Sequence, residues 1–116
     1  MQRDFETYLW DMHQAGVDIL RVTSGKCEEE YLGDRDLRRI VERNFEIIGE
    51  AIAQCRLRHP EQINSVGETE KIVAFRNRLA HAYHSIDDSF VWTVVQVNLT
   101  PLIAEVAALL DKWHQP

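Results

Sequence analysis

The side chains best suited to chemistry lie together in one short span, residues 76–84, which reads RNRLAHAYH. Arginine, histidine and tyrosine can act on a phosphodiester without a metal, because they bind phosphate oxygens and move protons. The wider span 71–86 carries five Lys, Arg or His residues and no Asp or Glu, although the whole chain has a net charge of −6. This local positive charge in an acidic chain predicts an anion-binding site.

Arg76 and His81 have the side chains that cleavage of RNA requires. A histidine is largely neutral near pH 7, so His81 is the candidate general base that takes the proton from a ribose 2′-hydroxyl. The guanidinium of Arg76 is the candidate for binding two phosphate oxygens and stabilising their charge in the transition state. The expected products are a 2′,3′-cyclic phosphate and a 5′-hydroxyl, without a divalent metal. DNA should not react, because it lacks the 2′-hydroxyl.

The other polar residues of the span have lesser predicted roles. Asn77 and His84 can position the substrate, and Tyr83 can donate a hydrogen bond to a phosphate or a base. His81 and His84 are three residues apart without a third His or Cys or a nearby carboxylate, so a metal site there is disfavoured. A structural interpretation also stays open, in which Arg76 is a surface residue and His81 faces solvent.

Helical geometry separates the two candidate catalytic residues. At about 100° per residue, one apolar stripe of this segment is formed by Ile72, Phe75, Leu79, Tyr83 and Ile86. Arg76 flanks that stripe, whereas His81 projects from nearly the opposite side. The two groups can meet if the helix breaks near Ala80, if the long arginine side chain reaches round, or if they come from two subunits of a symmetric dimer.

The elements that carry this span are predicted to be helices throughout. Apolar residues recur at helical spacing, and Gly and Pro residues separate the segments. We expect helices over residues 4–23, from an Asp34 or Asp36 cap to about residue 59, over residues 68–83, and from an Asp87 cap onward. Pro101 should kink or restart the last helix because it lacks a backbone donor.

Charged residues outside the span are predicted to face water. On the second helix, Arg39, Arg43, Glu46 and Glu50 lie opposite the apolar face, as water-facing charge pairs or, alternatively, as a site rim or dimer seam. The segment leading to that helix is predicted to be a polar connection through Leu32. Its three consecutive glutamates, residues 28–30, should form a solvated loop or a helix end.

Length and composition fit a single domain over residues 1–116, with one core. The acidic net charge argues against a protein that binds nucleic acid over its whole surface, but it allows a small basic site.

Cys27 and Cys55 do not have the spacing of metal ligands, and Cys55 lies on an apolar helix face and is expected in the core. No apolar run resembles a signal peptide or approaches the roughly 18 residues of a membrane span. A cytoplasmic location without membrane attachment is expected.

Three separated motifs give the chain a family resemblance. Arg76-x4-His81-x-Tyr83, with Asn77 after the arginine, resembles the Arg-x4-6-His-x-Tyr motif of HEPN domains, specifically of the HepT-like toxin branch. Residues 47–51, IIGEA, resemble that branch's second-helix signature, and Ile86-Asp87 with the later Val91-Trp92 resembles the segment C-terminal to its motif. The chain departs from the branch at residues 74–75, Ala-Phe in place of Gly-Met, and in lacking a Pro-Trp before the third helix.

The resemblance implies a HEPN-like, four- to five-helix up-and-down bundle that forms a homodimer, with motif residues of both subunits in a shared cleft. It implies a metal-independent endoribonuclease toxin that needs no cofactor. Its partner would be an MNT-type nucleotidyltransferase antitoxin, which transfers AMP from ATP to Tyr83. Arg76 and His81 would then be catalytic, and the supporting residues would be Asn77, Glu50 and His84.

Two other functions compete with this one. The first is a non-catalytic HEPN subunit that binds a nucleotidyltransferase and presents nucleotide or substrate to it, so that the motif binds phosphates without cleaving RNA. The second is a helical dimerisation module in which the Arg and His residues have no chemical role.

Overall fold

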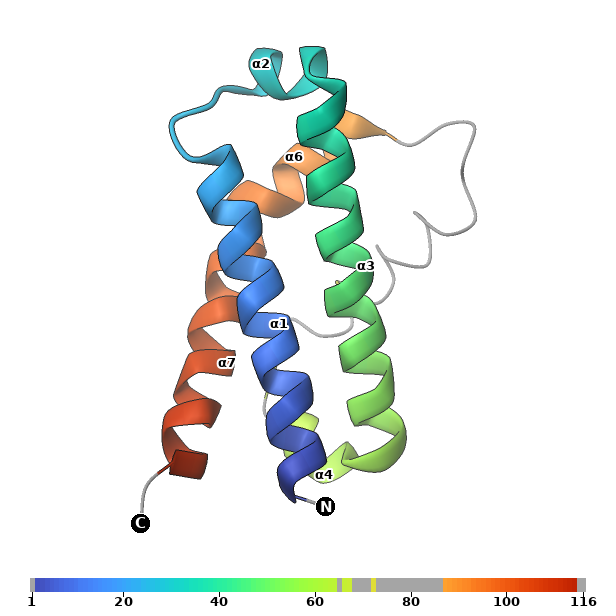
Figure 1. The fold of residues 1–116 in the computed structure, drawn as a ribbon, viewed down its shortest axis with the longest axis vertical. Coiled ribbons are helices and arrows are strands. Elements are labelled where there is room, and N and C mark those ends of the chain that lie inside the picture. Colours follow the sequence, from blue (N-terminus) through green and yellow to red (C-terminus); the bar gives the residue numbers. More distant parts are fainter. Residues whose placement is uncertain (1, 65, 68–71, 73–86, 115–116) are drawn as a thin grey trace.

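The computed structural model describes residues 2–64, 66–67, 72 and 87–114, and every regular element among them is an α-helix (Figure 1). The helices are, in chain order, α1 (Gln2–Thr23), α2 (Glu28–Gly33), α3 (Arg35–Arg58), α4 (Pro60–Ile63), α6 (Asp88–Val97) and α7 (Leu99–His114). The predicted all-α class is therefore confirmed for the described residues. The helix predicted over residues 68–83 lies outside them, and the exact bundle and the homodimer stay predictions.

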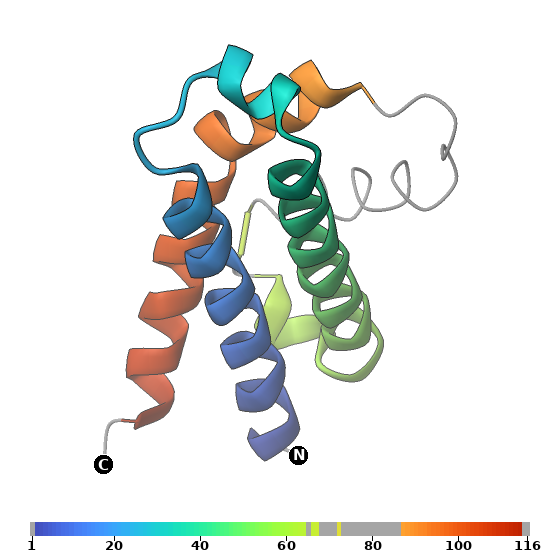
Figure 2. The same cartoon turned by 45° about the horizontal axis from the view of Figure 1, so that its top comes forward.

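Three long helices form the body of the molecule. α1 packs against both α3 and α7, and α3 and α7 run opposite to α1 along its length (Figures 1 and 2). The short helix α2 and helix α6 contact each other at the end where α1 finishes and α3 begins. This arrangement places the beginning of α6 beside the start of α3, where Asp88 lies 3.5 Å from Arg38.

The ends of α3 follow from local sequence, as predicted. The Asp34 side chain accepts a hydrogen bond from the Leu37 amide at 3.0 Å, which satisfies a donor of the first turn. At the other end the His59 amide donates to the Cys55 carbonyl, and Pro60 follows immediately. A proline disfavours helical geometry in the residue before it, so α3 ends there.

The predicted polar connection through Leu32 is wrong, because this segment is helix α2. The Cys27 amide donates to the Glu30 carboxylate at 3.0 Å, which closes the first turn and lowers the pKa of Glu30. Tyr31 is fully buried, with its ring centroid 5.4 Å from that of Trp92 on α6. The three glutamates of the first turn are exposed at a helix end, as expected.

The restart predicted at Pro101 is confirmed. The Asp87 side chain caps α6 by accepting from the Phe90 amide at 3.1 Å. α6 ends at Val97, α7 begins at Leu99, and the two axes differ by 45°. Pro101 lies in the first turn of α7, where a missing backbone donor costs little.

One cluster of buried apolar side chains joins the helices. Its largest members include Phe5, Leu9, Met12, Tyr31, Phe45, Ile48 and Ile52. Cys55 is buried and free, as expected, and burial raises its pKa to about 12. No single helix in the described part of the chain is long and apolar enough to cross a membrane, and the bent pair α6–α7 meets that test only when its two helices are taken together.

Candidate functional site

The described part of the chain contains one of the six predicted site residues, Glu50 on α3. The other five lie outside it: Arg76, Asn77, His81, Tyr83 and His84. The separation of Arg76 from His81 on an ideal helix therefore stays a prediction. The structure describes the residues that precede and follow the motif in the chain, and the surroundings of Glu50.

The residues that bracket the motif in sequence are packed or capped. Ile72, a member of the predicted apolar stripe, is fully buried in the core. Asp87 caps α6, and Val91 on the next turn is 1% exposed. The residue described before the motif, Ile72, thus belongs to the core, and the residue described after it, Asp87, is a helix cap.

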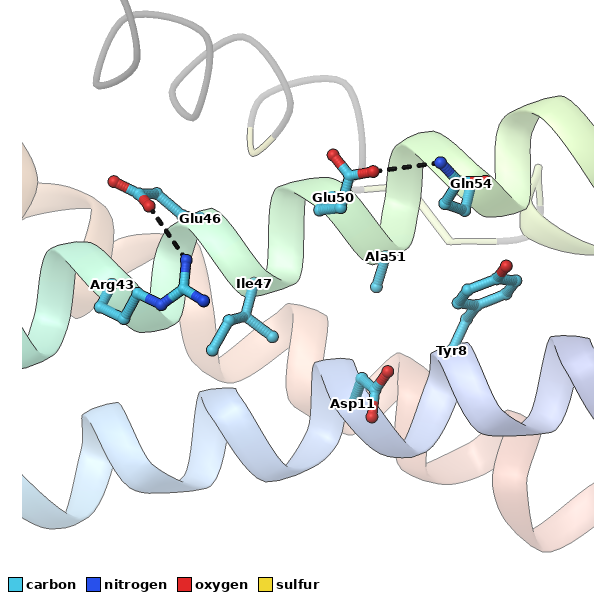
Figure 3. Close-up of a pocket in the computed structure, with 8 residues that line it drawn as sticks. All are labelled: Tyr8, Asp11, Arg43, Glu46, Ile47, Glu50, Ala51 and Gln54. Atoms are coloured by element: carbon cyan, nitrogen blue, oxygen red, sulfur yellow. Dashed lines mark hydrogen bonds and ion pairs between the residues drawn. The ribbon is translucent and has the colours of Figure 1, made fainter.

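Glu50 lies in a surface pocket of about 200 Å³ between α1 and α3 (Figure 3). The pocket is lined by Tyr8, Asp11, Arg43, Glu46, Ile47, Glu50, Ala51 and Gln54. Tyr8 and Asp11 project from α1 toward α3, while Ile47 and Ala51 supply the apolar lining. The sequence did not single out Tyr8, Asp11 or Gln54, because no pattern along the chain shows which residues of two helices meet.

Two polar contacts among the described lining residues join neighbours on the same helix. Arg43 Nη1 lies 3.3 Å from Glu46 Oε2, and Gln54 Nε2 donates to Glu50 Oε1 at 3.1 Å. The Arg43 and Glu46 side chains are 71% and 43% exposed, so the interpretation as a water-facing charge pair is confirmed for these two. Arg39 is exposed as well. Such exposed pairs contribute about 0–1 kcal/mol to stability.

The described lining of this pocket is more negative than positive. Among the described residues that line it, three carry carboxylates and one carries a guanidinium, which lies 3.3 Å from Glu46 Oε2. A second pocket of about 210 Å³ shares Asp11 and Ile47 with it and is also lined by Asp18 of α1 and Asn44 of α3. The described residues around Glu50 therefore supply little positive charge for binding a phosphate.

A second polar cluster lies where α2, α3 and α6 meet. Arg38 Nε is 3.5 Å from Asp88 Oδ2, and the Arg38 side chain also donates to the Leu32 carbonyl. Burial, and then the negative charge of Asp88, raise the pKa of the neighbouring Glu42. Burial likewise raises the pKa of Tyr31, whose hydroxyl has no hydrogen-bond partner among the described residues.

The described ranges contain no group of three or more His, Cys, Asp or Glu side chains that could hold a metal ion.

Comparison with known proteins identifies the family. The family model described as "HepT-like: Ribonuclease HepT-like" matches residues 12–109, a range that includes the whole motif. A protein named "Putative RNase MJ1380" from Methanocaldococcus jannaschii is 30% identical over 105 residues, which cover 90% of this chain and 95% of that protein. "Probable ribonuclease HepT" from Thermococcus cleftensis is 30% identical over 106 residues, or 88% of this chain and 92% of that protein. No solved structure matches. The chain belongs to the HepT-like ribonuclease family.

Proposed function

We propose that this chain is a metal-independent endoribonuclease that acts in the cytoplasm as the toxin of a toxin–antitoxin pair. The observation that carries the proposal is the Arg76-x4-His81-x-Tyr83 motif within the range matched by a ribonuclease family. The names of its relatives, which are RNase names, support RNA as the substrate class. The whole chain, residues 1–116, acts as one domain in this proposal.

The proposed reaction is a transesterification within RNA. His81 takes the proton of the 2′-hydroxyl, the 2′-oxygen forms a bond to the neighbouring phosphorus, and the bond from phosphorus to the 5′-oxygen breaks. The leaving 5′-oxygen takes a proton from solvent. Arg76 binds the two non-bridging oxygens and stabilises the charge that accumulates on them. Asn77, His84 and Glu50 position the substrate and these two side chains.

Tyr83 is the proposed control point. An MNT-type nucleotidyltransferase antitoxin transfers AMP from ATP to this residue: the phenol oxygen bonds to the α-phosphorus, and pyrophosphate leaves. The attached AMP adds negative charge and bulk where an RNA phosphate has to bind, so the modified protein repels its substrate.

Two copies of the chain form the proposed active unit. Arg76 and His81 are predicted on nearly opposite sides of one helix, so a cleft shared by two subunits supplies both groups to one phosphate. A symmetric pair places equivalent motifs face to face across a twofold axis, which permits this arrangement.

RNA cleavage in the presence of EDTA tests the catalytic roles. Arg76→Ala and His81→Ala should each lower the cleavage rate, and loss of a general base costs about 10²–10⁴-fold. Arg21→Ala and His13→Ala are matched controls on α1, because they remove the same side chains outside the motif. An oligonucleotide with a 2′-deoxy sugar at the scissile position should stay intact.

The outcomes separate the competing functions. Wild-type protein that leaves RNA intact and does not arrest growth without its neighbouring gene product would exclude the toxin and favour the non-catalytic HEPN subunit. Cleavage at full rate by His81→Ala would show that the proposed base is wrong even though the activity is right. Activity that requires a divalent metal would exclude the metal-independent mechanism.

Intact mass after incubation with the antitoxin and ATP tests the control point. Wild-type protein should gain AMP and lose its ribonuclease activity, and Tyr83→Phe should gain none. Tyr31→Phe is the matched control and should still be modified, because the hydroxyl it removes is buried. If the Tyr83→Phe protein still gained AMP, the residue that accepts AMP would not be Tyr83.

A further inference from the structure

Two long-range polar contacts hold the chain on either side of the motif. At the first, the Glu105 Oε2 atom on α7 accepts a hydrogen bond from the Gly67 amide at 2.8 Å, across 38 residues of sequence. Gly67 follows Val66, which is buried, and the Val66 amide donates to the Ile63 carbonyl at 3.0 Å. The chain is therefore tied to α7 just before it enters residues 68–86.

The second contact lies just after those residues. Arg38 Nε on α3 is 3.5 Å from Asp88 Oδ2 in the first turn of α6, with the two side chains 23% and 30% exposed. Arg38 also donates to the Leu32 carbonyl of α2, so one guanidinium joins three helices. Asp88 directly follows Asp87, the residue that caps α6.

The two contacts lie on either side of the motif in the chain, so both can act on the same segment. Residues 68–86 lie between them in the chain and include every residue of the motif. Apolar burial at Val66, Ile72 and Val91 attaches the neighbouring chain to the core, but apolar contact is not directional. Hydrogen bonds and ion pairs prefer particular distances and angles, so they can define where each end of the span lies.

We propose that Glu105 and Arg38 are positioning residues for RNA cleavage, which fix the two ends of the segment that carries Arg76 and His81. The proposal rests on the ribonuclease function proposed above. Catalysis by a general base and a guanidinium depends on their placement, and a displacement of about 1 Å can cost on the order of 10²-fold in rate. Release of one end should therefore lower kcat more than it raises KM.

Substitutions of Glu105 test the first contact. Glu105→Ala removes the acceptor, and we expect kcat for RNA cleavage to fall by about tenfold or more with KM changed less than about threefold. Glu105→Gln keeps an oxygen acceptor without the charge, so its kcat should lie between those of the wild type and of Glu105→Ala. Asp111→Asn is the matched control on the same helix, because it removes a carboxylate that is exposed to solvent. It should retain wild-type kcat.

Substitutions of Arg38 test the second contact. Arg38→Met keeps most of the aliphatic stem and removes the charge and the donors, so kcat should fall as in Glu105→Ala. Arg38→Lys keeps the charge and should retain more activity than Arg38→Met. Arg21→Met removes an arginine of an exposed ion pair, 3.7 Å from Asp18 on α1, and should leave kcat unchanged.

Hydrogen–deuterium exchange gives a readout that does not depend on activity. Glu105→Ala should speed exchange at the Gly67 amide and in peptides covering residues 64–88, while α1 and the middle of α3 keep wild-type protection. Unchanged exchange in both Glu105→Ala and Arg38→Met would overturn the anchoring. Faster exchange with unchanged kcat would overturn the positioning role. A wild-type protein that does not cleave RNA would refute the ribonuclease, and exchange alone would then decide whether the ends are held.

Discussion

At the scale of single residues, burial and neighbouring charges determine the pKa values of the titratable groups between α2, α3 and α6. Glu42 is partly buried, and the charged residues that affect its pKa most are Asp88 and Arg38. Burial and then Asp88 raise its pKa, and Glu46 adds a smaller effect in the same direction, whereas Arg38 opposes these effects. The carboxylate is therefore retained at a cost to the folded state near neutral pH.

Replacing Glu42 should stabilise the protein in a pH-dependent way. Its pKa in the folded state lies above the ordinary value of 4.5, so the folded state prefers the protonated form. The ionised carboxylate therefore destabilises the folded state above the raised pKa, and the penalty disappears below 4.5, where both states are protonated. We expect Glu42→Gln to raise the free energy of unfolding at pH 7–8 and to approach wild type as the pH falls below 4.5, measured by urea denaturation.

The exposed Asp111→Asn variant provides the control for the Glu42 measurement, because it removes a carboxylate that solvent already surrounds. It should follow wild type across the same pH range. Equal unfolding free energies of Glu42→Gln and wild type at pH 8 would contradict the assignment of a buried, destabilising charge.

At the scale of elements, α1 and α7 approach closely at a residue without a side chain. A Cβ atom at Gly16 would lie 2.7 Å from Ile103 Cγ1 and 2.9 Å from Ile103 Cδ1, closer than carbon atoms normally approach. Leu99 Cδ1 would lie at 3.6 Å, which is an ordinary contact. Gly16 thus costs α1 some helical stability but lets α7 pack against it.

Two opposing effects decide the outcome of Gly16→Ala. Alanine in a helix interior is favoured over glycine by about 0.5–1 kcal/mol, while overpacking against Ile103 costs about 1–3 kcal/mol. We expect Gly16→Ala to destabilise the wild-type protein by about 1 kcal/mol, because overpacking is the larger effect. In an Ile103→Ala background the same change should stabilise by about 0.5–1 kcal/mol, because only helix propensity remains.

Chemical denaturation of the four proteins in this cycle measures the coupling between the two positions, which should be roughly 0.5–3 kcal/mol. Additive effects would show that α1 and α7 do not meet at Gly16.

At the scale of the whole molecule, the proposed function places each active site between two chains. The described lining of the α1–α3 pocket beside Glu50 carries more negative than positive side chains. The basic groups are in the motif span, and helical spacing predicts that Arg76 and His81 point apart. A dimer in which each site takes Arg76 from one subunit and His81 from the other brings them together.

Mixing two inactive variants tests this arrangement. If Arg76→Ala and His81→Ala chains are combined in equal amounts, unfolded and refolded together, half of the dimers should contain one of each. Each mixed dimer has one intact site out of two, so RNA cleavage should recover to about a quarter of wild type. Separately refolded variants are the control and should stay inactive. No recovery in the mixture would indicate that both groups come from one chain.

Some features of the fold could be predicted because they depend on residues close together in the chain. Asp34 and Asp87 cap helices through bonds to amides three residues later, and Pro60 and Pro101 mark a helix end and a helix start. Helix α2 was missed because six residues are too few to show a helical period. Its stability depends on burial of Tyr31 against α6, which the local sequence does not reveal.

The sequence by itself determined the all-helical class of the described residues, both ends of α3, the start of α6, and the motif that places the chain in its family. These follow from the order of residues within a few positions of each other. The tertiary structure decided which distant residues come together: Tyr8 and Gln54 in the lining of one α1–α3 pocket, Glu105 with the Gly67 amide, and Arg38 with Asp88. Periodicity identifies the buried face of a helix, but only packing in three dimensions selects the face it meets.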